Sequence, residues 1–148
     1  MRYSIKPMVI ADYNEVVALW RDADGVGLNE SDTRSAIASY LQRNPRMSFV
    51  ARDGKKLVGA VLCGHDGRRG YLHHLAVAAS HRRKGLGTQL VAKSLAGLKR
   101  LQIQKCNIFL FTDNADGECF WTRTGWKKRL DLCLVQTNLV ASKAARCC

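Results

Sequence analysis

The chain lacks any long hydrophobic run. Hydrophobic residues make up 47% of its 148 residues, yet no apolar stretch approaches the roughly 18–20 residues that a membrane-spanning helix needs. The segment after Met1 is polar and mixed, which is not typical of a secretory signal peptide. We therefore expect a cytoplasmic protein that does not associate with membranes.

Metal-binding cysteine spacing is absent as well. The chain has six cysteines but no Cys-x-x-Cys pair, so no metal site is expected. Four cysteines lie in apolar segments and are predicted to be reduced core residues, namely Cys63, Cys106, Cys119 and Cys133. Residues 1–140 contain no repeat or linker and are predicted to form one domain. Residues 141–148 read as a basic tail that ends in two exposed thiols.

Acidic residues are scarce. Twelve Asp and Glu stand against 24 Lys and Arg, for a net charge of +12. Such a charge suits nucleic acid, an acidic acceptor or a polyanionic cofactor. The few aromatic residues, 7% of the chain, do not interleave with the basic clusters as a base-stacking platform requires. Nucleic-acid binding is therefore disfavoured, and the one basic cluster beside a recognisable site is 81–84.

That cluster lies between a predicted strand and a predicted helix. An apolar run ending at Val77 predicts a buried strand, and apolar residues on one face predict a helix over 85–99. Gly85 and Gly87 let the backbone approach a ligand closely. The first N–H groups of a helix have no intrahelical partners and bind anions. The stretch therefore predicts a phosphate site.

Spacing excludes two phosphate-loop families. The nucleotide P-loop needs Lys and Ser/Thr after its second glycine, and no segment fits. The dinucleotide fingerprint needs a small residue three positions after Gly87, where Leu90 stands. The remaining pattern, Arg82-x-x-Gly85-x-Gly87 after a strand, resembles the acyl-CoA pyrophosphate loop of the GNAT superfamily of N-acetyltransferases.

The predicted order of elements resembles the GNAT order over nearly the whole chain. The resemblance implies an α/β fold with a mixed central sheet, splayed between the fourth and fifth strands, and about four helices. Asp12 and Glu15 suggest a capping box for the first helix, which ends before Asp24. The other helices are expected at 31–42, 85–99 and 114–124. Strands are expected at 3–6, 47–52, 57–63, 72–77, 106–112, 126–129 and 132–136.

The same resemblance implies an acetyl-CoA site. In the family, the pantetheine arm lies against the splayed strand, the pyrophosphate lies on the loop, and an Asn at the start of the last helix contacts the cofactor. The expected cofactor-binding residues are Leu75, Ala76, Val77, Arg82, Arg83, Lys84, Gly85, Leu86, Gly87, Thr88, Asn114 and Trp121.

The chemistry implied by the resemblance is direct attack of a neutral amine on the thioester. Such a reaction needs a base, an oxyanion stabiliser and an acid for the leaving thiolate. The family's usual acid, a tyrosine in the last helix, is replaced by Trp121, whose indole N–H is not a usable proton source. Either another group protonates the thiolate or it leaves unprotonated. Trp121 is expected to pack on the pantetheine arm or in the core.

His73 is the predicted base, because imidazole titrates near neutral pH. The strand resembles that of the arylalkylamine acetyltransferases, whose two histidines fall on Tyr71 and His73. Alternation predicts that His73 and His74 lie on opposite faces of the strand. The other reading of His73 is a hydrogen-bonded core residue. Asp24 and Asp66 are weaker candidates for the base and are more typical of turns.

We therefore predict an acetyltransferase that acts on a primary amine, as a monomer or homodimer. The acceptor, either a small molecule or a peptide N-terminus, is not specified by the sequence. The acidic residues within 21–31 favour a cationic amine over an acidic one. The competing hypothesis is a non-catalytic acyl-CoA sensor, which the missing tyrosine keeps open.

Overall fold

The computed structural model describes residues 3–140, and its centre is a five-stranded sheet in the order β1-β2-β3-β4-β5. The first four strands are antiparallel neighbours, whereas β5 runs parallel to β4. This arrangement confirms the predicted mixed sheet. The strands are β1 Ser4–Pro7, β2 Phe49–Asp53, β3 Lys56–His65, β4 Gly70–Val77 and β5 Cys106–Ile108.

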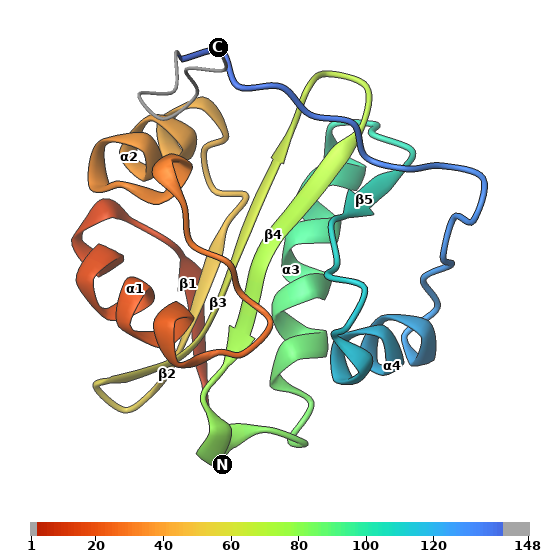
Figure 1. The fold of residues 1–148 in the computed structure, drawn as a ribbon. Coiled ribbons are helices and arrows are strands. Elements are labelled where there is room, and N and C mark those ends of the chain that lie inside the picture. The colour runs from red at the N-terminus through yellow and green to blue at the C-terminus, as the bar shows by residue number, and fades with distance from the viewer. Residues whose placement is uncertain (1–2, 141–148) are drawn as a thin grey trace, which may run out of the picture.

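Helices cover both faces of the sheet (Figure 1). One face carries α1 and α2, and the other carries α3 and α4. Three short 3₁₀ turns, η1, η2 and η3, precede α1, α2 and α3 respectively. The helical elements are η1 Ile10–Asp12, α1 Tyr13–Asp22, η2 Glu30–Asp32, α2 Arg34–Arg43, η3 Ala79–His81, α3 Leu86–Arg100 and α4 Ala115–Arg123.

Two hydrophobic clusters hold these layers on the sheet. The first joins α3 to the sheet through Leu86, Leu90 and Leu98 and includes Trp121 of α4. The second joins α1 and α2 to the other face through side chains such as Trp20, which is fully buried. Burying apolar area of this kind stabilises a fold by roughly 25 cal/mol per Å². The sheet is therefore a rigid platform between two cores.

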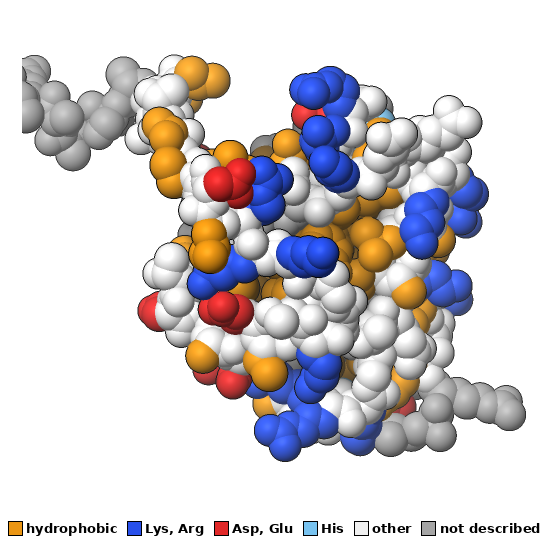
Figure 2. Space-filling view, turned by 90° about the vertical axis from the view of Figure 1, so that its right-hand side faces the viewer, with side chains coloured by type: hydrophobic (Ala, Val, Ile, Leu, Met, Phe, Trp, Pro, Cys, Tyr) orange, Lys and Arg blue, Asp and Glu red, His pale blue; other side chains and the backbone are white. Residues whose placement is uncertain are grey.

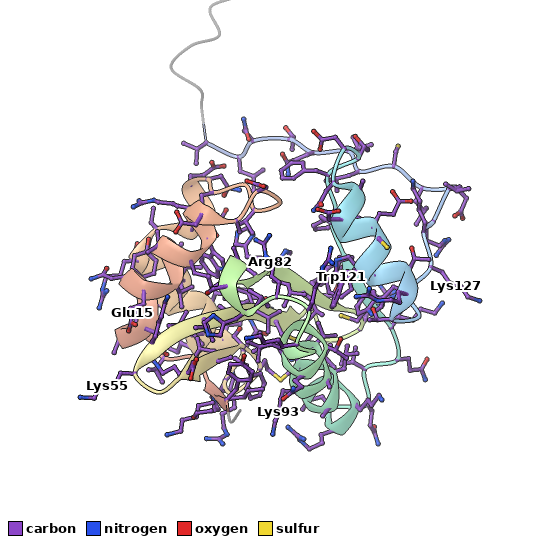
Figure 3. All side chains as sticks on the ribbon, turned by 90° about the horizontal axis from the view of Figure 1, so that it is seen from below. Glu15, Lys55, Arg82, Lys93, Trp121 and Lys127 are labelled. Atoms are coloured by element: carbon purple, nitrogen blue, oxygen red, sulfur yellow. The ribbon has the colours of Figure 1, made fainter. Side chains whose placement is uncertain are left out.

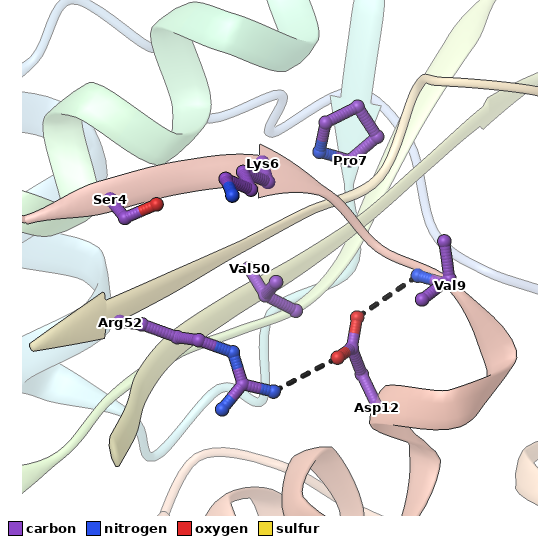
Figure 4. Close-up of a pocket in the computed structure, with 7 residues that line it drawn as sticks. All are labelled: Ser4, Lys6, Pro7, Val9, Asp12, Val50 and Arg52. Carbon is purple, nitrogen blue, oxygen red and sulfur yellow. Dashed lines mark hydrogen bonds and ion pairs between the residues drawn. The ribbon is translucent and has the colours of Figure 1, made fainter. Parts of the chain in front are cut away.

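The predicted capping box at the start of α1 is wrong. Asp12 accepts the Val9 N–H within η1 and pairs with the guanidinium of Arg52 at 2.9 Å, and it makes no side-chain cap for α1. Glu15 also pairs with Arg52. Asp12 and Arg52 border a hollow of about 220 Å³ at the β1–β2 end of the sheet (Figure 4). The guanidinium of Arg52 on β2 competes with the helix N-terminus for the Asp12 carboxylate and wins, because a charge-assisted hydrogen bond is stronger than a neutral one.

The predicted splay between the fourth and fifth strands is confirmed. Pairing of β4 with β5 covers only Gly70 to Leu72 on the β4 side, although β4 continues to Val77. The fifth strand was predicted to reach residue 112, but it ends at Ile108. Beyond that point the chain diverges from β4 and enters α4.

The two closing strands predicted at 126–129 and 132–136 do not form. Among the described residues after Arg123, none belongs to a helix or strand. The apolar residues of the segment, for example Leu132 and Leu134, are 63% and 64% exposed. The physical reason lies in β5, which offers a ladder of only three residues to a further strand. Hydrophobic side chains lie between scattered Lys and Arg on the face that carries α4 (Figure 2).

The cysteine prediction is correct for part of the set. Cys63 is buried and Cys106 is half-buried, and burial raises the pKa of the two thiols to about 12 and about 11. Cys119 and Cys133 are exposed, contrary to the prediction. Residues 141–148 lie outside the described part of the chain. Within that part, no helix is both long enough and apolar enough to cross a membrane.

Candidate active site

The predicted phosphate loop connects β4 to α3. Gly85 is the N-cap of α3 and has φ +77°, a left-handed conformation that glycine adopts without steric cost. The hydrogen bond from the Gln89 N–H to the Gly85 carbonyl begins the helical ladder. The N–H groups of residues 86–88 therefore precede the ladder and remain available to an anion. The first turn of α3 contains no acidic residue that would repel one.

Two contacts fix the loop to the sheet. His81 Nε2 lies 2.9 Å from a carboxylate oxygen of Asp53, which ends β2. Arg82 Nε donates to the Val77 carbonyl at 3.1 Å, while Arg82, Arg83 and Lys84 all remain exposed. Figure 3 shows Arg82 on the loop before α3 and Trp121 on neighbouring α4. The loop thus combines a fixed backbone with exposed cationic side chains, and both fit a pyrophosphate.

A β-bulge interrupts β4 where it separates from β5. Ala60 pairs with Ala76 and Leu62 pairs with His73, so His74 and Leu75 together lie opposite the single residue Val61. His74 has φ +54°. A left-handed residue with a Cβ costs about 1–2 kcal/mol. The bulge also changes which side chains share a face of the sheet.

The predicted separation of the two histidines on opposite faces is wrong for this reason. His73 lies against Tyr40 of α2, with ring centroids 6.4 Å apart, and His74 lies against Trp20 of α1, at 4.9 Å. Both rings therefore face the α1–α2 side. After the bulge, Leu75 packs with the α3 cluster and Ala76 with the α1 cluster.

The His73 ring lies among other rings. It stacks on Tyr71 at 6.3 Å and lies 5.9 Å from Phe109. Within the described residues, its nitrogens make no hydrogen bond, so the reading of His73 as a hydrogen-bonded core residue is not supported. Burial, and then the charge of His74, lower the pKa of His73, while Asp32 acts in the opposite direction. The imidazole is therefore neutral at pH 7 and able to accept a proton.

His74 belongs to a different network. Its Nε2 donates to Asp32 Oδ1 at 2.9 Å, and the other Asp32 oxygen accepts the Asn29 N–H at 3.0 Å. The His74 carbonyl accepts the Trp20 indole N–H at 2.9 Å. The Asp32 carbonyl accepts the Tyr13 hydroxyl at 2.7 Å. The network ties the bulge to η2 and α1.

The loop between α1 and η2 approaches the segment between β5 and α4. A Cβ on Gly25 would lie 2.5 Å from Asn114 Nδ2, and one on Gly27 would lie 2.9 Å from the Phe111 ring. Asn114 caps α4 by accepting the Gly117 N–H. The missing side chains of the two glycines are what permit this approach.

Trp121 occupies the core beneath this region. It is only 9% exposed and meets Trp126 edge-on at 4.8 Å between centroids.

The two weaker candidates for the base, Asp66 and Asp24, lie away from His73. Asp66 accepts the Arg68 and Arg69 N–H groups in the turn before β4, and these bonds lower its pKa. Asp24 is exposed and has no described contact with His73.

The structure therefore places His73 and the predicted strand residues 75–77 on the part of β4 that no longer pairs with β5, just before the phosphate loop. We call this point of separation between the two strands the opening. Sequence reasoning missed the supporting residues His81, Asp53, Asp32 and Phe109. For His81, Asp53 and Asp32 the sequence contains no local signal, because their partners lie far along the chain. Phe109 and Phe111 carried a weak signal, since they alternate with Leu110 at the end of a strand.

Known proteins share both the sequence pattern and the fold. The profile of the Acetyltransferase (GNAT) family matches residues 13–126. N-alpha-acetyltransferase 30 of Schizosaccharomyces pombe is 30% identical over 104 residues, which are 67% of this chain and 69% of that protein. An acetyltransferase of Yersinia pestis is 30% identical over 103 residues, covering 70% and 72% of the two chains.

Solved structures agree in fold. The PaiA N-acetyltransferase of Thermoplasma acidophilum, crystallised with coenzyme A, superposes with a TM-score of 0.76 at 17% identity and covers 86% of this chain and 91% of its own. The NatC complex bound to Gag peptide and CoA gives a TM-score of 0.69 at 22% identity, covering 84% of both chains. By its sequence profile, its relatives and its splayed sheet, this chain belongs to the GNAT family of acetyltransferases.

Proposed function

We propose that the protein transfers an acetyl group from acetyl-CoA to a primary amine by direct attack, with His73 as the base. One observation carries the proposal. The β4–β5 pairing ends at Leu72, so a neutral imidazole stands one residue beyond the point where the strands separate. An amine that enters from the α1–α2 side would meet that imidazole before the thioester.

The residues around the opening fit acetyl-CoA. The exposed cations Arg82, Arg83 and Lys84, with the free N–H groups of residues 86–88, match a pyrophosphate. The backbone of Leu75, Ala76 and Val77 is free of β5 and would offer pairing groups to a pantetheine arm, although the Val77 carbonyl already accepts the Arg82 Nε–H. Asn114, at the start of α4, lies on the α4 side, and Trp121 packs in the core beneath it. When bound, acetyl-CoA supplies the activated thioester.

His73 then performs the proton transfer. Its neutral ring accepts a proton from the substrate ammonium, and the amine lone pair becomes free to form the C–N bond as the C–S bond breaks. The thiolate leaves with the electron pair of that bond. The nitrogen loses its second proton as the amide forms, and solvent water carries that proton to the thiolate, which a thiol pKa of about 8.5 makes a tolerable leaving group. Trp121 contributes packing and no proton.

The surroundings of His73 suit a cationic amine. The ring faces of Tyr71 and Phe109 attract an ammonium group. Residues 22–33 contain no Lys or Arg but carry Asp22, Asp24 and Glu30, all exposed, in a protein of net charge +12. A peptide N-terminus and a small amine both meet this requirement. The similarity to N-alpha-acetyltransferase 30 favours the peptide.

The test is CoA release over a panel of amines and short peptides, run beside a calorimetric titration with acetyl-CoA. We expect binding and turnover with at least one cationic acceptor. Peptides with a free N-terminus are compared with the same peptides acetylated in advance, which should not react. Binding of acetyl-CoA without turnover of any acceptor would contradict the enzyme and favour the sensor, for which the Tyr-to-Trp replacement at Trp121 is the supporting observation.

A further inference from the structure

The bulge in β4 is held by residues far away in the sequence. His74 has the left-handed φ of +54°, which side chains with a Cβ disfavour. Its ring binds Asp32, 42 residues earlier, and its carbonyl binds Trp20, 54 residues earlier. Strained backbone of this kind persists only where its surroundings hold it, and it concentrates at functional sites.

The bulge decides the geometry of the opening. Without it, the alternation of β4 would place His73 and His74 on opposite faces. With it, both rings face the α1–α2 side, while Leu75 and Val77 pack toward α3. The direction of the His73 ring and the backbone edge at residues 75–77 therefore depend on one backbone conformation.

The Asp32–His74 pair engages both carboxylate oxygens of Asp32 and one ring nitrogen of His74. His74 Nε2 is engaged by Asp32 Oδ1, and Asp32 Oδ2 accepts the Asn29 N–H. Their side chains are 18% and 8% exposed. Asp32, with both oxygens paired and little exposed, suits a structural role near a site better than proton transfer with a substrate. The Nδ1 atom of His74 makes no hydrogen bond within the described residues, so substitutions at this position must separate its backbone role from its imidazole chemistry.

We propose that Asp32 and His74 are a positioning pair, whose hydrogen bond holds the β4 bulge and so aims His73 and the backbone of residues 75–77 at the reacting groups. The proposal rests on the proposed function, because it takes His73 as the base. It also gives η2 a role. Asp32 ties the loop between α1 and η2 to β4, and the glycines of that loop approach Phe111 and Asn114.

Three substitutions at one position separate the roles of backbone and side chain. His74→Ala loses the bond to Asp32 and keeps the left-handed strain. His74→Gly loses the bond and removes the strain. His74→Asn tolerates the left-handed conformation and retains a polar side chain. If the pair acts by holding the bulge, kcat should fall about 100-fold in the alanine variant and about 10-fold or less in the other two, because misplacement near 1 Å has effects of that size.

Affinity and stability provide the controls. The dissociation constant of acetyl-CoA should rise by no more than about tenfold in all three variants, because the phosphate loop has its own anchor at Asp53 and only the pantetheine edge at residues 75–77 depends on the bulge. The matched control is Gln102→Gly, which replaces a second left-handed residue, with φ +60°, beyond the end of α3. It should not change kcat. Circular dichroism and melting temperatures show that each variant is folded.

A readout independent of turnover is the titration of the His73 ring by NMR. The titratable groups around it are His74 on its own strand, Asp32 from η2, Tyr40 from α2 and Tyr71. Asp32 favours the protonated ring, so Asp32→Asn should lower the pKa of His73 and move the rising limb of the pH–rate profile to lower pH.

The outcomes are distinguishable. Equal loss of kcat in the alanine, glycine and asparagine variants would overturn the proposal, because it would make the imidazole of His74 itself essential. Wild-type kcat in His74→Ala would also overturn it. If no acceptor is turned over, the proposed function fails, and the His73 titration still decides whether Asp32 and His74 set the state of that ring. An unchanged His73 pKa in Asp32→Asn would then count against the pair.

Discussion

The β4 bulge lies at the start of residues 74–77 and the phosphate loop follows their end. The two features are stabilised in different ways. In the loop, the N-cap of α3 has φ +77° and is a glycine, so its conformation is allowed locally. Arg83 in the same loop is also left-handed, with φ +61°. In the bulge, the residue with φ +54° is His74, which depends on Asp32 and Trp20. The cofactor side of the site is therefore mainly a local device, with one distant anchor at Asp53, and the acceptor side is a tertiary one.

This difference has a functional meaning. A local device can be carried from protein to protein with its motif, which suits a cofactor that every member of a family uses. A tertiary device changes whenever α1, η2 or α2 changes, which suits an acceptor that differs between members. Four predictions test this contrast, beginning with the largest effect.

The largest effect should follow His73→Ala. Loss of a positioned general base lowers the rate by about 10²–10⁴-fold, whereas acetyl-CoA affinity should stay nearly constant because the loop is intact. Steady-state kinetics and calorimetry measure the two quantities. His65→Ala, which removes a histidine outside the site, serves as the control. A full rate in His73→Ala would move the base to water or to an acidic residue such as Asp24.

The loop should respond in the opposite sense, through affinity. A Cβ at Gly87 would lie 3.4 Å from Phe120, an ordinary contact, so Gly87→Val should fold while obstructing the pyrophosphate. We expect acetyl-CoA affinity to fall at least about tenfold in Gly87→Val. Arg82→Ala should weaken affinity several-fold, since a charge-assisted contact contributes ~1–3 kcal/mol. Lys93→Ala, on the exposed face of α3, should bind normally, and isothermal titration makes the comparison.

The predicted pH dependence of the rate and of stability arises from His73, on the acceptor side of the site. Burial lowers the pKa of His73 below its ordinary value of about 6.5. The rising limb of kcat/KM should therefore have its midpoint below pH 6.5. Between the folded and unfolded pKa values the unfolded chain binds the extra proton, so stability falls as pH drops through that window. Urea unfolding at pH 5 and pH 7.5 measures this term, and His73→Phe should reduce it.

The smallest effect on rate is expected for Trp121→Tyr. The indole is buried against Trp126 and donates no proton, so turnover should be unchanged or higher with tyrosine. The smaller ring leaves space in the core and should reduce stability by about 1–2 kcal/mol, within the usual range for core substitutions. Thermal unfolding and CoA release are measured on the same samples. A large loss of rate would mean that the indole itself orders the cofactor.

Sequence patterns predicted the elements that bury a regular face. The apolar spacing of α3 and the run that forms β3 were recognisable because each has a partner along its whole length. The wrong predictions concern segments whose structure depends on a partner far away in the sequence. Arg52 drew Asp12 away from its helix cap, and the three-residue β5 gave the alternating segment after Trp126 no ladder. The prediction that Cys119 is buried failed for a similar reason, since the packing of α4 leaves Cys119 on its exposed face.

The amino-acid sequence by itself determined the phosphate loop, the order of elements and the family, because these depend on residues close together in the chain. The tertiary structure decided which way the two histidines point. A one-residue bulge reverses the alternation of a strand, and its left-handed residue is a histidine that no local rule would place there. Only the packing of α1 and η2 on β4 brings Trp20 and Asp32 within reach of His74 and makes that conformation stable.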